Sequence, residues 1–520
     1  MKRILLAVLI AAILFGCQQP AEKPSDTGKV TETPSEKKIE MFAHSSSCFC
    51  HDNLRDRSGN DVSILSEWQQ SMMAHASKDP YWRAKVSSEI AKFPELEDVI
   101  EEKCARCHMP MASFQAKSEG VDVNIQEFLS HKSSFYQLAD DGVSCTLCHQ
   151  ILPDNFGQEE SFIGNFLIDE KTEKPDRRIF GPFTPVMAQA MRNSAGYTPE
   201  EGKHVEKAEL CAICHTLYTP YLDDSGNVAG EFPEQTPYLE WLNSRYNPNT
   251  PCQKCHMPQS SNVKVSTRPP NLPERSPFFR HVFAGANAQM LELMGAKDGA
   301  RKAEEMLGSF ISIKIVSAEK NGDKLNVDVK VENNAGHKFP TGFPSRRAWI
   351  HLKVTDGEGN VVFESGRAEN GRIVGEDSPY EPHHDVITKE DDVQIYEAVM
   401  VDVNGKVTQT LLRAADYIKD NRIPPKGFDI ENAEPDVAVR GKAIADPSFR
   451  GGEDVVSYVI DVSGYQGPFR VEAELLYQPV SYPFLKDLEK ISTSEIENFL
   501  ARFAEVKGYT IVSSDTASVS

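Results

Sequence analysis

Residues 101–110 read EEKCARCHMP, and the pattern Cys-x-x-Cys-His lies at their centre. The same pattern occurs three more times, as CTLCH at 145–149, CAICH at 211–215 and CQKCH at 252–256. With 11 Cys and 14 His in 520 residues, chance predicts only roughly 0.006 copies. Four copies therefore indicate a chemical function that organises this part of the chain.

The spacing fits covalent attachment of haem c. Two thiols three positions apart reach the two vinyl groups of one haem, and the next residue places an imidazole on the iron. Zinc sites also use such cysteine pairs, but zinc does not require a His after every pair, and disulfides this local would link nothing distant. The predicted thioether cysteines are Cys104, Cys107, Cys145, Cys148, Cys211, Cys214, Cys252 and Cys255, and the predicted proximal iron ligands are His108, His149, His215 and His256.

The amino terminus predicts export. A basic start is followed by an apolar run of about a dozen residues, which is too short for a membrane span and is typical of a cleaved signal peptide, here residues 1–16. The segment LFGC ending at Cys17 resembles a bacterial lipobox, which implies a lipid on Cys17; the alternative is an ordinary signal cut nearby. The polar segment 17–43 is predicted to be a disordered, lipid-anchored tether. We expect a periplasmic or cell-surface protein, and Gln18 after Cys17 favours the outer membrane.

A fifth Cys-His pair occurs at Cys48-Phe49-Cys50-His51, where the two cysteines are only two positions apart. Cys50 and His51 would hold a haem through one thioether, with Cys48 free or attached in a contracted loop. The alternative is a degenerate site without haem. Occupancy is favoured because exported proteins tend not to keep idle, exposed thiols. We therefore expect four haems and leave a fifth open.

Six-coordinate iron needs a second axial ligand. Nine histidines lie outside the five motifs, enough for two imidazoles on every iron. Each of them is also compatible with an ordinary core or surface role. The predicted distal ligands are His75, His131, His204, His281 and His337.

A weak internal repeat accompanies the motifs. Glu-Trp-x-x-Ser occurs at 67–71 and again at 240–244, and each copy precedes a Cys-His-Met-Pro segment, at 107–110 and 255–258. The repeat suggests a duplicated haem-binding unit.

The character of the sequence changes near residue 305. No Cys follows, and apolar residues alternate with polar ones, as in LNVDVKVE at 325–332, which is typical of strands with one buried face. We expect an α+β multidomain fold. It has a loop-rich, mainly α multihaem cytochrome c domain at 44–305, an antiparallel, immunoglobulin-like β-sandwich at 306–480 with a long insertion at 366–450, and a C-terminal helix with a disordered tail at 481–520.

Five segments together resemble a bacterial multihaem cytochrome family. They are DGVSCTLCHQI at 141–151, HVEKAELCAICHTLYT at 204–219, EFPEQTPYLEWLNS at 231–244, CQKCHMP at 252–258 and GHKFPTGFPSRRAWIHL at 336–352. The family is related to tetrahaem cytochromes that accept electrons from hydroxylamine oxidation. The resemblance implies stacked haem pairs, mostly bis-His iron, and respiratory or extracellular electron transfer. Its implied partners are other redox proteins, such as cytochromes, quinol oxidases or outer-membrane conduits.

The formal net charge of −21 argues against binding to nucleic acid and against an electrostatic hold on anionic lipids. The leading hypothesis is an electron carrier rather than an enzyme. A second is a reductase of a small nitrogen or sulfur oxyanion with one open haem, for which the motif at 48–51 is the candidate. A third is a haem-containing binding or assembly module. The sequence leaves the oligomeric state open.

Overall fold

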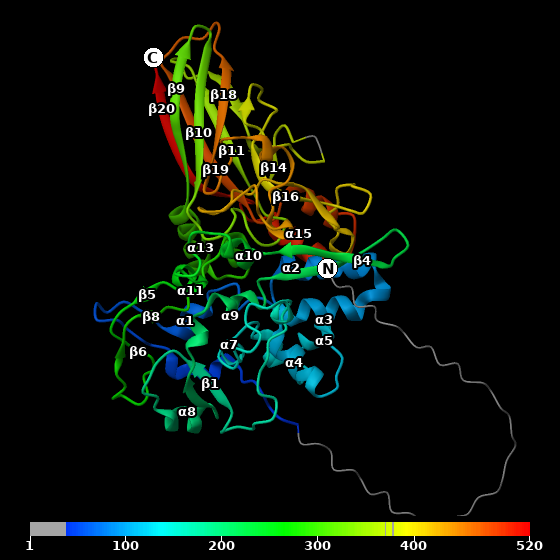
Figure 1. The fold of residues 1–520 in the computed structure, drawn as a ribbon, viewed down its shortest axis with the longest axis vertical. Coiled ribbons are helices and arrows are strands. Elements are labelled where there is room, and N and C mark those ends of the chain that lie inside the picture. The colour runs from blue at the N-terminus through cyan, green and yellow to red at the C-terminus, as the bar shows by residue number, and fades with distance from the viewer. Residues whose placement is uncertain (1–37, 370, 377–378) are drawn as a thin grey trace, which may run out of the picture. The chain divides into compact units, whose positions relative to one another are not determined.

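The computed structural model describes residues 38–369, 371–376 and 379–520 (Figure 1). The predicted signal peptide 1–16, the lipid on Cys17 and most of the predicted tether lie outside the described residues. Ile39 to Ser520 form one compact unit. Within the described part, no helix combines the length and the apolar character that crossing a membrane would need.

The last residues of the predicted tether belong to the fold. Met41 and Phe42 are 2% and 0% exposed, and they pack in an apolar cluster with Met111 and Leu147. The tether prediction is therefore wrong for residues 39–43, because three apolar side chains at its end are buried against the haem-motif region.

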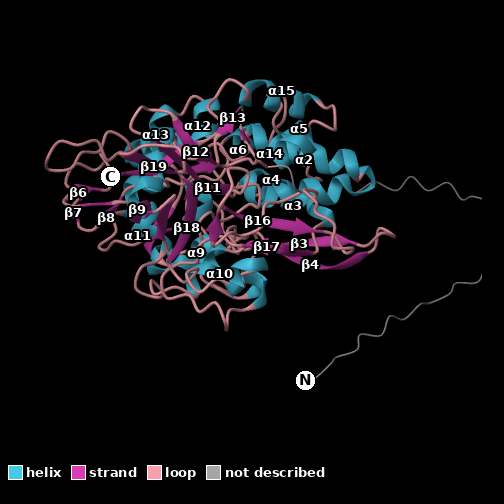
Figure 2. Ribbon diagram, turned by 90° about the horizontal axis from the view of Figure 1, so that it is seen from above, coloured by secondary structure: helices cyan, strands magenta, loops and turns pink. Residues whose placement is uncertain are grey.

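Short helices and loops predominate in the described chain up to residue 310 (Figure 2). The longest are α2 (Pro80–Lys92), α3 (Glu97–His108), α4 (Pro110–Ser118) and α13 (Lys297–Phe310). Asp79 caps α2 by accepting from the backbone N–H of Tyr81. The other α-helices here are α1 (Ile64–Trp68), α5 (Ile125–Phe128), α6 (Tyr136–Asp140), α7 (Cys145–Cys148), α8 (Ala188–Ser194), α9 (Ala208–Ala212), α10 (Pro237–Leu242), α11 (Cys252–His256) and α12 (Ala288–Leu293).

Four small two-stranded sheets support the loops. They pair β1 (Arg178–Gly181) with β2 (Thr198–Glu201), β3 (Leu217–Leu222) with β4 (Val228–Gln235), β5 (Gln259–Ser260) with β8 (Phe278–Phe279), and β6 (Val263–Lys264) with β7 (Glu274–Arg275).

Two larger sheets share one hydrophobic core after residue 310. The first has the order β15 (Val386–Ile387), β18 (Glu453–Asp461), β10 (Lys324–Asn333), β9 (Ile311–Asn321). The second has the order β17 (Asp416–Asp420), β16 (Ile395–Val401), β11 (Arg347–Thr355), β19 (Phe469–Gln478), β20 (Thr510–Val519), with β12 (Val361–Ser365) also on β11. A small hairpin pairs β13 (Ala368–Glu369) with β14 (Arg372–Ile373). Alternate residues of β10 are buried, as the period-two pattern predicts. The α+β class is confirmed, whereas the immunoglobulin-like topology stays a prediction.

Two expectations for the β-rich half are wrong. The segment 366–450 is not an insertion outside the sheets, because it supplies β15, β16 and β17, and every residue of β16 is buried. The tail is not disordered, because β20 pairs along β19 from Thr510 to Val519. The predicted C-terminal helix is present as two shorter ones, α14 (Tyr482–Leu488) and α15 (Ser494–Phe503).

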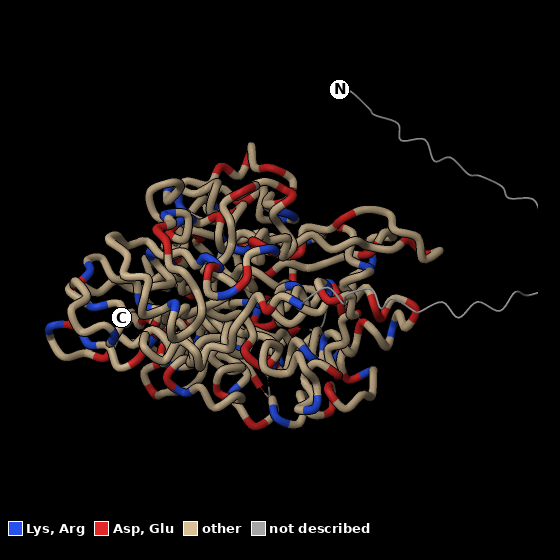
Figure 3. Tube along the Cα trace, turned by 90° about the horizontal axis from the view of Figure 1, so that it is seen from below, with Lys and Arg blue, Asp and Glu red and all other residues tan. Residues whose placement is uncertain are grey.

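Buried contacts join the two halves of the chain. One apolar cluster combines Ala84 of α2 and Phe232 of β4 with Met400 of β16 and Phe499 of α15. A buried ion pair joins Glu240 of α10 to Arg422, just after β17. Acidic and basic positions are interspersed over the visible chain (Figure 3).

Candidate functional site

One cavity of ≈ 1370 Å³ is lined by residues from all five Cys-His motifs. It exceeds the roughly 300–1,000 Å³ of ordinary small-molecule pockets. Apolar side chains dominate its wall, including Trp68, Leu147 and Trp241. The loop before β11, which carries His337, closes part of it. The β-rich half therefore helps to build the same site as the motif helices.

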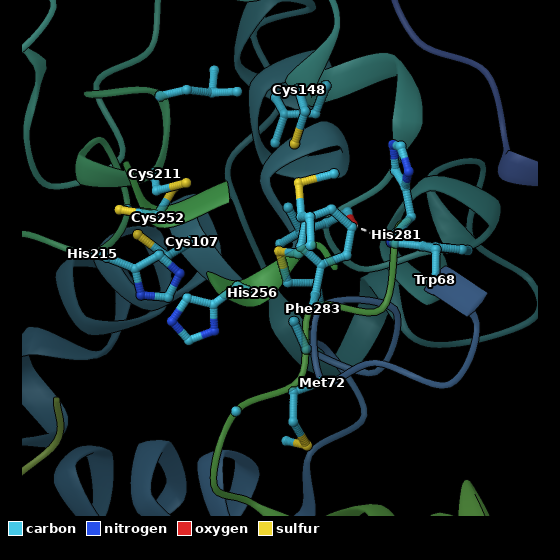
Figure 4. Close-up of a pocket in the computed structure, with 18 of the residues that line it drawn as sticks. Trp68, Met72, Cys107, Cys148, Cys211, His215, Cys252, His256, His281 and Phe283 are labelled. Carbon is cyan, nitrogen blue, oxygen red and sulfur yellow. Dashed lines mark hydrogen bonds between the residues drawn. The ribbon is translucent and has the colours of Figure 1, made fainter. Parts of the chain in front are cut away.

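Thiols of different motifs are neighbours within the cavity. Cys48 contacts Cys145, Cys107 contacts Cys214, and Cys211 contacts Cys252. The Cys148 thiol lies close enough to Cys211 and Cys214 to interact electrostatically with both. The five motifs therefore form a connected series. The motif at 48–51 adjoins the motif at 145–149, which adjoins the motif at 211–215. The motif at 211–215 in turn adjoins those at 104–108 and 252–256. Figure 4 shows Cys107, Cys211 and Cys252 gathered beside His215 and His256.

Backbone carbonyls orient the motif imidazoles. The Nδ1–H groups of His51, His108, His149 and His256 donate to the carbonyls of Val265 (2.7 Å), Ala76 (3.0 Å), Phe180 (2.6 Å) and Ala284 (2.7 Å). This hydrogen bond fixes the orientation of each ring and leaves the lone pair of Nε2 free to bind a metal. Burial lowers the pKa of His108 and of His256 to about 4. The rings are therefore neutral at pH 7, the form that binds metals.

Two motif histidines face a second histidine. The rings of His149 and His281 have centroids 6.2 Å apart and planes inclined by 23°. His256 and His337 repeat this arrangement at 6.2 Å and 20°. Imidazole nitrogens bind metals at about 2 Å, so two rings on opposite sides of one metal have centres about 6 Å apart. Both pairs therefore fit an iron between the rings.

The second histidines of these pairs are oriented like the motif histidines. The Nδ1 of His281 is hydrogen-bonded to the carbonyl of Phe279 (3.1 Å), and that of His337 to the carbonyl of Lys338 (2.9 Å). Burial lowers the pKa of His281 to about 3. The donor set, the ring spacing and the apolar wall together fit haem c.

The structure does not bring the other three predicted distal histidines to the cavity wall. His131 is exposed, and its ring lies 4.3 Å from that of Tyr136. His204 uses Nε2 to donate to the carbonyl of Ile151 (2.9 Å). His75 is half-buried near the charges of Lys78 and Asp140. Their role as ligands stays a prediction.

Among the described residues, no second imidazole is stacked at this spacing on His51, His108 or His215. His108 instead stacks on Trp82, with ring centroids 4.5 Å apart. Burial and the nearby Arg346 guanidinium lower the pKa of His215. Sequence reasoning missed Trp82, which lies in no recognisable motif, and assigned no role to Arg346, although Arg346 lies in the segment 336–352.

Comparison with known proteins identifies the fold. No family model and no curated protein matches the chain. A solved structure of a penta-heme cytochrome c552 from Thermochromatium tepidum is similar, with a TM-score of 0.52 and 15% sequence identity. The match covers 92% of this chain and 100% of that chain. The chain thus shares the fold of a multihaem c-type cytochrome, and the likeness includes the β-rich half.

Proposed function

We propose that this protein is a multihaem c-type cytochrome that carries electrons through covalently bound haems. The observation that carries the proposal is the single apolar cavity, lined by all five Cys-His motifs with neighbouring thiols in contact. Groups attached to these motifs would lie side by side, as electron transfer between them requires. Bound haem c would supply iron that changes oxidation state.

The residues of the chain have three roles in this proposal. The thiols would attach the haems, by two bonds each at the four Cys-x-x-Cys-His motifs, and the carbonyl-oriented imidazoles would bind the iron. The apolar wall excludes water. Axial ligands and burial set the reduction potential of each haem. The pairs His149–His281 and His256–His337 are the best-supported bis-His sites.

We propose a fifth haem at the contracted motif. His51 has the same Nδ1–carbonyl bond as three other motif histidines. Cys48 and Cys50 both line the cavity, and Cys48 contacts Cys145 of the third motif. A haem bound there would extend the series at its end.

The proposed setting is the periplasm or the cell surface, with a lipid on Cys17 anchoring the chain, most simply to the outer membrane. The proposed partners are other redox proteins. A net charge of −21 favours partners with a basic or neutral docking face.

A second candidate function is reduction of a small nitrogen or sulfur oxyanion. It is favoured by the three motif histidines that face no second histidine among the described residues. Arg346 lines the cavity near His215 and would supply a cation for an oxyanion. This function requires a haem whose second axial position is open.

The first experiment is a count of covalent haems by mass spectrometry on the exported protein. Four or five haems are expected, and a chain without covalent haem would refute the proposal. Cys50→Ala should lower a count of five by one, whereas Cys48→Ala should not if Cys50 alone carries the first haem.

The second experiment separates the two functions. One sample of the dithionite-reduced protein is mixed with carbon monoxide. Other samples are mixed with nitrite, hydroxylamine or sulfite. A carrier should give little spectral change with carbon monoxide and no catalytic turnover. An open haem together with turnover would favour the reductase.

A further inference from the structure

The two Glu-Trp-x-x-Ser segments have the same local structure. Ser71 Oγ donates to the carbonyl of Trp68 at 2.7 Å, and Ser244 Oγ donates to the carbonyl of Trp241 at 2.7 Å. Both indole N–H groups donate to a backbone carbonyl at 2.9 Å, that of Val143 for Trp68 and that of Thr250 for Trp241. The sequence repeat is therefore a repeat in three dimensions, centred on a buried Glu-Trp pair.

The first copy holds the segment that carries His281. Glu67 is only 6% exposed, and it pairs with Arg280, whose Nε donates to Glu67 Oε1 at 2.6 Å. The same carboxylate lies close to the backbone N–H of His281. Glu67 therefore binds the residue before His281 and lies beside the residue that faces His149.

The second copy holds the segment that carries His337. Glu240 is 0% exposed, and its Oε2 accepts from the backbone N–H of Lys338 (3.0 Å) and from Thr341 Oγ1 (2.6 Å). Its other oxygen lies 3.0 Å from the Arg422 guanidinium. Here too a buried carboxylate combines an arginine with a backbone N–H beside the second histidine of a pair.

The two tryptophans pack against the segments that carry His281 and His337. Trp68 belongs to an apolar cluster that includes Phe283, and the Phe283 ring meets the His281 ring edge-on at 5.5 Å and 89°. Figure 4 shows Trp68, Phe283 and His281 grouped together. Trp241 packs on Gly336, next to His337, where a Cβ would lie 3.2 Å from the indole Cδ1.

We propose that the two Glu-Trp-x-x-Ser segments are clamps, each of which fixes the second imidazole of one histidine pair. Glu67 and Glu240 are positioning residues that act through His281 and His337. This inference rests on the proposed haem function. A buried carboxylate is costly even when paired. Glu67 nevertheless lies close to the backbone N–H of His281, and Glu240 accepts from the backbone N–H of Lys338, next to His337.

Without the clamp, the segment at His281 loses its bond to a buried carboxylate, and the imidazole would be less firmly held opposite His149. The iron would then accept an external ligand. The same reasoning applies to His337 and His256.

The test uses carbon monoxide as the probe on the reduced, haem-loaded protein. Glu67→Gln and Glu240→Gln should each raise the carbon monoxide-sensitive absorbance above wild type, by up to the equivalent of one haem, and weaken one low-spin signal in electron paramagnetic resonance. The matched control is Glu305→Gln, which removes an exposed glutamate paired with Arg301 and should match wild type.

A double variant protects the test against simple misfolding. Glu67→Gln/Arg280→Gln removes both charges of the pair, so that neither is left unpaired, and it still lacks the clamp. His281→Ala supplies the comparison: adding Glu67→Gln to it should raise the carbon monoxide response no further, because both changes act on the same iron.

The outcomes distinguish the two proposals. Absence of covalent haem from the wild type would defeat the proposed function. Full haem content with a carbon monoxide response equal to wild type in Glu67→Gln, in Glu240→Gln and in the double variant would overturn the clamp alone. Responses of Glu67→Gln and His281→Ala that simply add would also overturn it, because Glu67 would then not act through His281.

Discussion

A histidine can bind a metal only through a ring nitrogen that is not already engaged. His281 and His337 have Nδ1 on a backbone carbonyl and face another imidazole, whereas His204 has Nε2 on the carbonyl of Ile151 and does not line the cavity. All three lie in similar loop contexts in the sequence. The choice of nitrogen depends on carbonyls supplied by the folded backbone, for which the sequence has no signal.

Removal of the second histidines should open defined sites. His281→Ala and His337→Ala should each make about one haem sensitive to carbon monoxide, because the facing ring that occupies the second axial position is lost. His351→Ala is the control and should leave the spectrum unchanged, since both ring nitrogens of His351 are engaged by the carboxylates of Glu474 and Glu364. Spectral titration of the reduced variants measures this, and a response of His351→Ala equal to theirs would contradict the assignment.

A buried carboxyl in the β-rich half predicts a pH dependence of stability. Burial raises the pKa of Asp454 to about 7, and Tyr396 donates to its Oδ2 at 2.8 Å. The folded chain therefore holds a proton that the unfolded chain has released. The resulting stabilisation is full below about pH 4 and is lost as the pH rises through about 7.

Asp454→Asn keeps the shape but cannot ionise. Its free energy of unfolding relative to wild type should rise by about 2–3 kcal/mol between pH 5 and pH 8, since one pKa unit corresponds to about 1.4 kcal/mol. Urea unfolding at the two pH values measures this difference. Asp323→Asn, on an exposed turn, is the control, and equal pH dependence in both variants would refute the prediction.

At the level of elements, sequence patterns predicted strands where one face is continuously apolar and failed elsewhere. LNVDVKVE at 325–332 lies within β10 as expected. β20 reads TIVSSDTASV, and its small and polar side chains hid a strand whose buried positions include Val512 and Val519. Side chains of β20 also bond to β9: Asp515 Oδ2 accepts from the backbone N–H of Ile315 at 2.9 Å. Such hydrogen bonds do not recur at a regular spacing along the chain, so the sequence does not reveal them.

Neighbouring residues of β20 provide a matched test of this strand. Val512 is 7% exposed in the shared core, and Ile511 is 46% exposed on the opposite face. Val512→Asp should lower the free energy of unfolding by about 2–4 kcal/mol because it buries a charge, whereas Ile511→Asp should stay within about 0.5 kcal/mol of wild type. Denaturant unfolding of both variants decides the matter, and equal effects would mean that the tail is not part of the sheet.

At the scale of the whole molecule, the β-rich half completes the haem-motif half. His337 reaches the cavity from the loop before β11, and the base of that loop is tied to α10 by Glu240. Lys338, Asp420 and Arg422 join Glu240 in one buried cluster of two positive and two negative groups. The Cys-His motifs could be predicted because they are local. This cluster could not, because it joins Glu240 to residues that lie about a hundred to nearly two hundred positions further along the chain.

The cluster predicts that Arg422 supports both the stability of the chain and one histidine pair. Burial alone would raise the pKa of Asp420, but Arg422 and Lys338 outweigh it and hold the value at about 2. Asp420 therefore stabilises the fold above about pH 4, and this contribution is lost as the pH falls through about 2.

Arg422→Gln leaves Glu240 and Asp420 buried with less compensation, and it should lower the free energy of unfolding by about 3–5 kcal/mol at pH 7. It should also make the His256 haem alone more sensitive to carbon monoxide, because the His337 loop loses part of its anchor. Arg470→Gln removes an exposed arginine paired with Glu472 and should do neither. Urea unfolding combined with carbon monoxide titration measures both effects, and loss of stability without a change at any haem would show that the cluster joins the two halves without positioning His337.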